Sequence, residues 1–167
     1  TLVLIIPLMV ILAIVAKPFV ILLLTEKWAP MIPYLQLMTI VGVMHPIHTV
    51  NIQVLFAQGK SRLNFNLNMM KNGFRVINII VMYRFGVIYI ILGEVILSFV
   101  ALVINTYYTK KLIDYGLFKQ LRDIGLILTG SLVVGVIIFA LTLVFTNYWL
   151  ILLGGPLMYL GFYVLFH

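Results

Sequence analysis

Apolar residues in this chain form long, nearly unbroken runs that do not alternate with polar ones. The sequence opens "TLVLIIPLMVILAIV" and continues in this way, interrupted only by short polar segments. A helix needs ~20 apolar residues to cross a bilayer, whereas barrel strands are about half as long and alternate. The pattern predicts an all-α, polytopic membrane protein, a bundle of about six transmembrane helices with short loops, near residues 2–24, 31–57, 62–83, 86–108, 124–145 and 148–166.

The composition agrees with a membrane protein. Hydrophobic residues make up 64% and charged residues 9% of the 167 residues, and the mean hydropathy is +1.21. Soluble domains carry about 25% charged residues, so this chain has too few to cover a water-facing surface. The absence of cysteine excludes disulfides and cysteine-ligated metals, and no metal or cofactor is expected. Because the chain starts without Met inside an apolar run, we expect residues 1–167 to belong to a larger protein.

Lysine and arginine are unevenly distributed between alternate connections, which predicts the topology. Cytoplasmic loops of membrane proteins are enriched in basic residues. Two connections, 58–62 and 109–123, hold six of them, so these and the C-terminus are predicted to be cytoplasmic. Segment 112–123 is either a plain loop or a short amphipathic helix that lies on anionic lipid headgroups. The six are Lys60, Arg62, Lys110, Lys111, Lys119 and Arg122, against Lys27 and Arg84 on the other side.

Several residues within the predicted spans shape the helices. Proline removes a backbone donor and kinks a helix, so kinks are expected at Pro7, Pro18, Pro46 and Pro156. Ser131 and Gly135 have the small-xxx-small spacing that allows two helices to approach closely. We therefore interpret these two small residues as a packing contact.

The third predicted span carries a polar stripe. Asn64, Asn68, Lys71, Arg75 and Asn78 follow one another at steps of four, three, four and three residues, which keeps them on one helix face. Each lysine or arginine at the bilayer centre costs about 2.5–3.5 kcal/mol. The stripe is therefore expected to face other helices or a water-filled cavity.

Glu94, the only acidic residue within a predicted span, is the expected partner of Arg75. Arg75 precedes Arg84 by nine residues, ~14 Å of helix, and Glu94 follows Gly86 by eight, ~12 Å. A tight "RFG" turn would place the two charges at nearly the same depth. This pair either orients two helices only or forms part of a cationic cavity for an anionic substrate. We favour the cavity because the ion pair alone leaves Lys71 and the asparagines unexplained.

Polar residues also share one side of the second span. His45, His48 and Asn51 fall within about a third of the helix circumference. The His-x-x-His spacing is a weak metal site without further ligands, and a proton relay is conceivable. Hydrogen bonds between helices beside Pro46 are the favoured interpretation. His48 and Asn51 are nevertheless added to the candidate cavity.

Three segments resemble polysaccharide flippases of the Wzx type, in the multidrug/oligosaccharidyl-lipid/polysaccharide exporter superfamily. "AKPFVILLLTEKWAPMIPYLQLM" is similar to a family stretch with Gly-x-x-Trp followed by a helix that opens with Leu-Gln. "NIQVLFAQGKSR" is similar to its Asn…Ala-x-Gly-Arg turn, and "RFGVIYI" to the glycine that opens the next helix. Thr25 stands where glycine is usual and Lys60 where arginine is usual, while the matching residues are Glu26, Lys27, Trp28, Leu35, Gln36, Asn51, Ala57 and Gly59.

The resemblance implies a transporter of about 12 to 14 spans in two bundles, of which residues 1–167 would be most of the C-terminal one. It implies export of polyprenyl-diphosphate-linked oligosaccharide across the bacterial inner membrane for surface polysaccharide, by alternating access. The diphosphate would bind Lys71 and Arg75, and the asparagines would bind sugar hydroxyls.

Three other functions are weighed against the flippase. A cation-coupled multidrug exporter of the same superfamily would use an acidic residue, and Glu94 is available, but the excess of cations disfavours cationic drugs. A membrane enzyme of polysaccharide assembly would need catalytic arginine or histidine in large loops, and the longest connection has no histidine. A scaffold subunit made only of helices is the third. We expect no enzyme activity and no nucleic-acid binding.

Overall fold

The computed structural model describes residues 2–144 together with positions 154, 157 and 161. Over residues 2–144 every regular element is a helix, so the all-α prediction is confirmed. The predicted span 148–166 lies outside this continuous stretch. The elements are α1 (Leu2–Ile14), α2 (Ala16–Leu24), η1 (Glu26–Met31), α3 (Ile32–Ala57), α4 (Ser61–Met82), η2 (Tyr83–Phe85), α5 (Val87–Ile113) and α6 (Leu117–Val144).

The chain divides into two compact units. One gathers residues 1–39 with residues from 125 onward, and the other consists of residues 40–124. The first unit contains α1, α2 and the greater part of α6, and the second contains most of α3, the whole of α4 and the whole of α5. Each unit is described separately below, and the candidate site lies entirely within the second.

The first predicted span, 2–24, is two helices and not one. The axes of its two parts, Val3–Ile14 and Ala16–Leu24, are bent by 73°. Pro18 explains the position of the break, because its ring nitrogen cannot donate to the carbonyl of Ile14 four residues earlier. Pro18 instead falls in the first turn of α2, where a missing N–H costs little.

Close packing of α1 against α6 organises the first unit. Ile11 and Val15 form a buried apolar cluster with Val134 and Ile138. Gly135 lies within this contact, and a Cβ added there would come within 2.8 Å of the Ile14 side chain. The interpretation of Gly135 as a packing residue is therefore confirmed.

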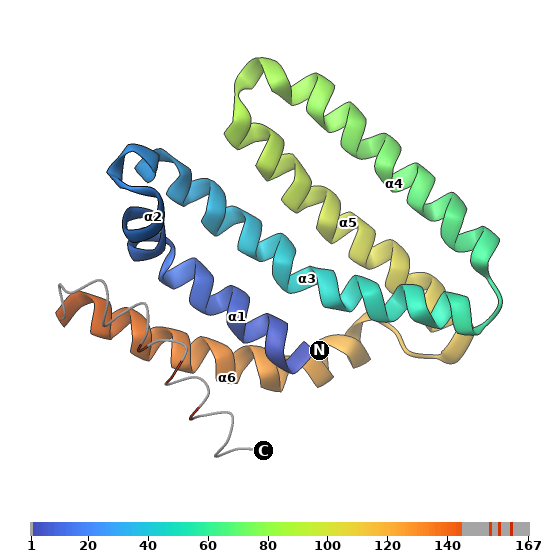
Figure 1. Cartoon of the computed structure of the whole chain (residues 1–167). Helices are drawn as coiled ribbons and strands as arrows, with labels where there is room; N and C mark the ends of the chain where they lie inside the picture. The colour runs from blue at the N-terminus through green and yellow to red at the C-terminus, as the bar shows by residue number, and fades with distance from the viewer. Residues whose placement is uncertain (1, 145–153, 155–156, 158–160, 162–167) are drawn as a thin grey trace. The chain divides into compact units, whose positions relative to one another are not determined.

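Two antiparallel helices, α4 and α5, form a hairpin in the second unit (Figure 1). The turn consists of η2 and Gly86, whose φ of 109° is strained for any residue with a side chain. The sequence predicted both the hairpin and its glycine. The helix bounds also agree closely with the predicted spans 62–83 and 86–108, except that α5 continues to Ile113.

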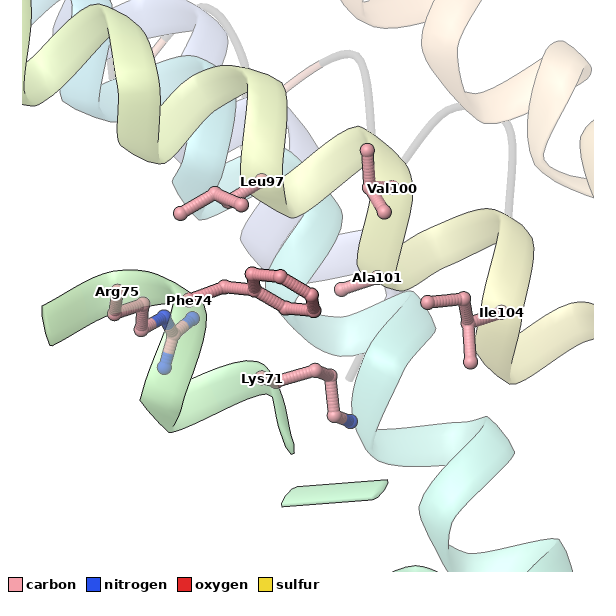
Figure 2. Close-up of a pocket in the computed structure, with 7 residues that line it drawn as sticks. All are labelled: Lys71, Phe74, Arg75, Leu97, Val100, Ala101 and Ile104. Carbon is pink, nitrogen blue, oxygen red and sulfur yellow. The ribbon is translucent and has the colours of Figure 1, made fainter. Parts of the chain in front are cut away.

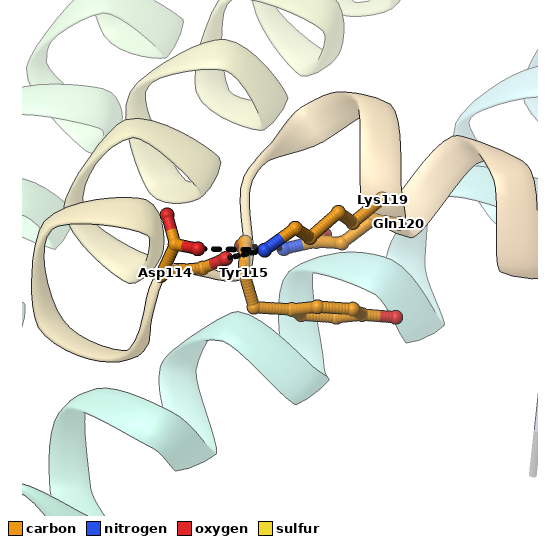
Figure 3. A network of polar contacts seen from close by, with 4 residues as sticks. All are labelled: Asp114, Tyr115, Lys119 and Gln120. Carbon is orange, nitrogen blue, oxygen red and sulfur yellow. Dashed lines mark hydrogen bonds and ion pairs between the residues drawn. The ribbon is translucent and has the colours of Figure 1, made fainter.

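The connection after α5 is a tight turn, so a plain loop over 109–123 is wrong, whereas the alternative of a helix in segment 112–123 agrees in part because residues from Leu117 onward are helical. Asp114 ends α5 with a φ of 52°, and α6 begins at Leu117. Lys119 Nζ donates to both the backbone O and Oδ2 of Asp114, each at 2.7 Å, and Gln120 Nε2 donates to the Tyr115 carbonyl at 3.1 Å (Figure 3). Lys119 and Gln120 therefore donate to backbone carbonyls that water would have to satisfy in a longer loop. The turn needs only three residues.

The described helices amount to two to four membrane spans, fewer than the six expected. The segments Glu26–Ala57 and Val87–Ile113 are each long and apolar enough to cross a bilayer. Two further spans are counted if each bent pair, α1 with α2 and the two parts of α6, forms one span. Helix α4 is not among them, because its polar stripe lowers its hydropathy. The protein is membrane-embedded by this criterion.

Candidate functional site

Polar side chains of α3, α4 and α5 meet within the second unit, in a group that we call the polar seam. The stripe on α4 faces its neighbours, as expected: Asn64 is buried, whereas Ile80 on the apolar face is 67% exposed. Asn68, Lys71 and Asn78 are partly buried and Arg75 is exposed, so the stripe turns only in part toward the neighbouring helices. The seam consists of His48 (α3), Asn64, Asn68, Lys71, Arg75 and Asn78 (α4), and Glu94, Ser98 and Asn105 (α5).

Arg75 and Glu94 form the ion pair that the depth argument predicts. Arg75 Nε lies 2.9 Å from Glu94 Oε1, across the hairpin from α4 to α5. The Glu94 side chain is 21% exposed and that of Arg75 is 49% exposed. One end of the arginine is therefore neutralised, and much of its side chain is still open to a ligand.

Lys71 is held by an amide and not by a carboxylate. Its Nζ donates to Asn105 Oδ1 at 3.1 Å. Among the ion pairs of the described residues, none involves Lys71. A neutral amide supplies a hydrogen bond without cancelling the charge, so the seam carries one more positive than negative group.

His48 connects α3 to this arrangement. Its Nδ1 lies 3.2 Å from Asn105 Nδ2, and its Nε2 lies 3.2 Å from Ser98 Oγ. The favoured interpretation, that His48 makes hydrogen bonds between helices, is confirmed. His45 is exposed, and no group of three or more metal-ligating side chains occurs in the described part of the chain. His-x-x-His is therefore not accompanied by the further ligands that a metal site requires.

A small pocket opens beside the two cations (Figure 2). From α4 the residues Lys71, Phe74 and Arg75 line it, and the ring of Phe74 points toward α5. The opposite wall, from α5, is entirely aliphatic and consists of Leu97, Val100, Ala101 and Ile104. The pocket therefore has two cationic side chains on one side and aliphatic side chains on the other.

The asparagines assigned to the cavity are used largely inside the protein. The prediction that Asn51 lines the cavity is corrected. Asn51 is fully buried outside the seam, and its amide exchanges hydrogen bonds of 2.9 and 2.8 Å with Gln120. Asn78 Nδ2 donates to the Ile90 carbonyl at 3.0 Å. Asn64 Oδ1 accepts from Asn68 Nδ2 at 3.3 Å. The Asn51 and Asn78 amides link neighbouring helices and the Asn64–Asn68 bond lies within α4, so Lys71 and Arg75 are the seam residues best placed to meet a ligand.

Sequence reasoning missed the polar residues of α5 that complete the seam. Ser98 and Asn105 are both buried, as is Thr109 beyond them. Together with Glu94 they follow steps of four, seven and four residues, which is a helical face. The same helical periodicity that indicates the stripe on α4 indicates this second one, in which Glu94 is charged and the other three residues are neutral.

Comparison with protein-family models, with curated proteins and with solved structures gives no match to this chain.

Proposed function

We propose that this chain is a transmembrane bundle of a flippase that moves polyprenyl-diphosphate-linked oligosaccharide across the bacterial inner membrane for surface polysaccharide biosynthesis. The observation that carries the proposal is Lys71, a half-buried cation that pairs with no carboxylate among the described residues, beside Arg75. Keeping such a charge in a membrane helix is costly unless an anion meets it during function. A diphosphate provides acceptors for both side chains.

The pocket favours an amphiphilic anion over a water-soluble one. Its cationic wall and its aliphatic wall face each other across the α4–α5 hairpin. A lipid diphosphate has the matching arrangement, because charged oxygens are joined directly to an isoprenoid chain. The diphosphate would bind Lys71 and Arg75, and the first isoprene units would lie against Leu97, Val100 and Ile104.

Backbone geometry at Thr25 supports the resemblance to the Wzx-type family. Thr25 stands at the position where that family usually has glycine, and its φ is 78°. Positive φ is the conformation that glycine adopts without strain. Gln36, which matches the family's Leu-Gln, donates to the Ala13 carbonyl at 3.0 Å, beside the break between α1 and α2.

The finer architecture belongs to the same proposal. Six spans result if α4 and residues 148–166 are counted with the four described above. The uneven distribution of lysine and arginine then places 58–62, the α5–α6 turn and the C-terminus in the cytoplasm. In a two-bundle transporter this bundle would move against a second one to give alternating access.

A multidrug exporter of the same superfamily is less well supported by the contacts. Such a transporter would need an acidic side chain free to bind a cation. Glu94 is the acidic residue of the seam, and it is paired with Arg75. The remaining charge of the seam is positive, which repels a cationic drug.

Binding of farnesyl diphosphate to the chain in lipid nanodiscs tests the proposal. We expect binding that neither farnesol nor inorganic pyrophosphate reproduces, because each lacks one half of the ligand. Lys71→Gln should weaken it about tenfold, the cost of one charge-assisted hydrogen bond. Lys17→Gln removes an exposed cation of the first unit and serves as the control. Equal affinity of wild type and Lys71→Gln would contradict the proposal.

A further inference from the structure

The hydrogen-bond chain Lys71–Asn105–His48–Ser98 allows only one assignment of its hydrogens. An ammonium group only donates, so it must meet the carbonyl oxygen of Asn105, as the 3.1 Å contact to Oδ1 shows. The Asn105 amino group then points at His48 Nδ1, 3.2 Å away, and also only donates. His48 Nδ1 must therefore accept, which leaves the imidazole neutral with its hydrogen on Nε2, facing Ser98 Oγ.

A protonated His48 is incompatible with this arrangement. Its Nδ1–H would point at the Asn105 amino group, so two donors would oppose each other. If the Asn105 amide turned over, its oxygen would accept from His48, but its amino group would then face the Lys71 ammonium. One amide oxygen can thus serve Lys71 or protonated His48, and not both at once.

From this exclusion we propose that His48 is a proton-binding site linked through Asn105 to anion binding at Lys71. When a phosphate oxygen accepts the hydrogen bond of the Lys71 ammonium in place of Asn105, the Asn105 amide is free to turn its oxygen toward His48. The Nδ1 lone pair then accepts a proton from a buffer acid in the solvent, and its new N–H donates to the Asn105 oxygen, which replaces the earlier hydrogen bond from the Asn105 amino group. The anion is consequently bound together with a proton, and each ligand raises the affinity for the other. This inference rests on the proposed function.

The charged groups around His48 also favour binding of the anion and the proton together. The charged and titratable groups near His48 are Lys71 and Arg75 from α4, and His45 one turn earlier on α3. From α5 the carboxylate of Glu94 is engaged by Arg75. Lys71 and Arg75 both repel a protonated His48, and a bound anion offsets that repulsion. Asn105 is a positioning residue here, since it acts on a ligand only through Lys71.

The test is the number of protons taken up when farnesyl diphosphate binds to the chain in nanodiscs. Calorimetric titrations in buffers of different ionisation enthalpy give this number near neutral pH. We expect wild type and His45→Gln to take up the same number, and His48→Gln to take up fewer, by as much as one proton per ligand. The change in ligand protonation is common to all three, so the difference isolates His48.

Asn105→Leu provides a second variant that keeps both Lys71 and His48. We expect farnesyl diphosphate to bind with proton uptake below that of wild type, because the amide that links the two sites is gone and only the nearby charges of Lys71 and Arg75 still couple them. Nitrogen NMR of histidine-labelled wild type without ligand should show His48 as the neutral form protonated at Nε2. The other tautomer, or a charged ring, would overturn the inference.

The outcomes separate this inference from the proposed function. Binding that depends on Lys71 but has the same proton uptake in wild type, His48→Gln and Asn105→Leu would overturn the inference alone. Absence of farnesyl diphosphate binding to wild type would overturn the proposed function and the inference together. Lower uptake in both variants, with wild-type uptake in His45→Gln, supports the inference.

Discussion

The side chains of Arg75 and Glu94 meet across the α4–α5 hairpin, with Arg75 Nε 2.9 Å from Glu94 Oε1. They lie side by side because each is about two turns of helix from its own end of the turn, Arg75 before Tyr83 and Glu94 after Gly86. Arg75 is thereby fixed beside Lys71, and the two cations line one pocket. The pair therefore positions the charge that a substrate would meet.

Removing Glu94 alone should harm the fold more than removing both members of the pair. Glu94→Gln leaves Arg75 without its counter-charge, and we expect a loss of about 1–3 kcal/mol in the free energy of unfolding. The double variant Arg75→Gln, Glu94→Gln should recover part of that loss. Chemical unfolding in detergent measures both. A double variant less stable than Glu94→Gln would contradict this account.

Much of the second unit follows from the sequence, for identifiable reasons. A helical stripe of polar residues that includes Lys71 must turn inward, and a glycine after "RF" must close a tight turn. Both depend on local chemistry and on the cost of charge in lipid. The α4–α5 hairpin and the Arg75–Glu94 contact were predictable on these grounds alone.

Other features depend on contacts that periodicity does not reveal. The α5–α6 turn is short because Lys119 and Gln120 satisfy its carbonyls, and nothing in their spacing indicates this. Asn51 shares a helix face with His48, yet its amide pairs with Gln120, far along the chain. The break near Pro18 was expected only as a kink, because a proline indicates where a helix is interrupted and not how large the angle is.

Gly93 is expected to tolerate no side chain while Asn78 is present. A Cβ at Gly93 would overlap the Asn78 amide, which donates to the Ile90 carbonyl. Gly93→Ala should therefore cost about 1–3 kcal/mol of stability through overpacking and the lost hydrogen bond. In an Asn78→Ala background the same change should cost much less. A double-mutant cycle of thermal unfolding gives the coupling, and additive effects would show that the two residues do not touch.

Replacing Thr25 by glycine should stabilise the first unit. A β-branched residue at a φ of 78° is strained, and its side chain is exposed. We expect a net gain of about 0.5–2 kcal/mol after the entropy cost of glycine is subtracted. Thr49→Gly, in the interior of α3, is the matched control and should lose about 1 kcal/mol. Thermal unfolding of the two variants compares them, and a lower midpoint for Thr25→Gly would contradict the strain.

Tyr115 should make the α5–α6 turn sensitive to high pH. Its hydroxyl donates to Asp123 Oδ2 at 2.7 Å, and this bond to a carboxylate raises the pKa of Tyr115. Because the folded pKa exceeds the unfolded one, the contribution to stability is complete below pH ~10 and is lost as pH rises through the folded value. Tyr115→Phe should therefore be less stable than wild type at pH 8, and the difference should shrink toward pH 11. A pH-independent difference would mean that the hydrogen bond is not what Tyr115 contributes.

The central claim is that Lys71 and Arg75 meet an anionic substrate. It is tested most directly by export of surface polysaccharide in a strain whose own copy of the gene is deleted and replaced by variants. Export is normalised to the amount of the protein in the membrane. Lys71→Gln with Arg75→Gln should abolish export while the protein stays in the membrane, and Lys71→Arg should keep part of it because the charge is retained. Full export by the double glutamine variant would contradict the account and leave both residues with a structural role only.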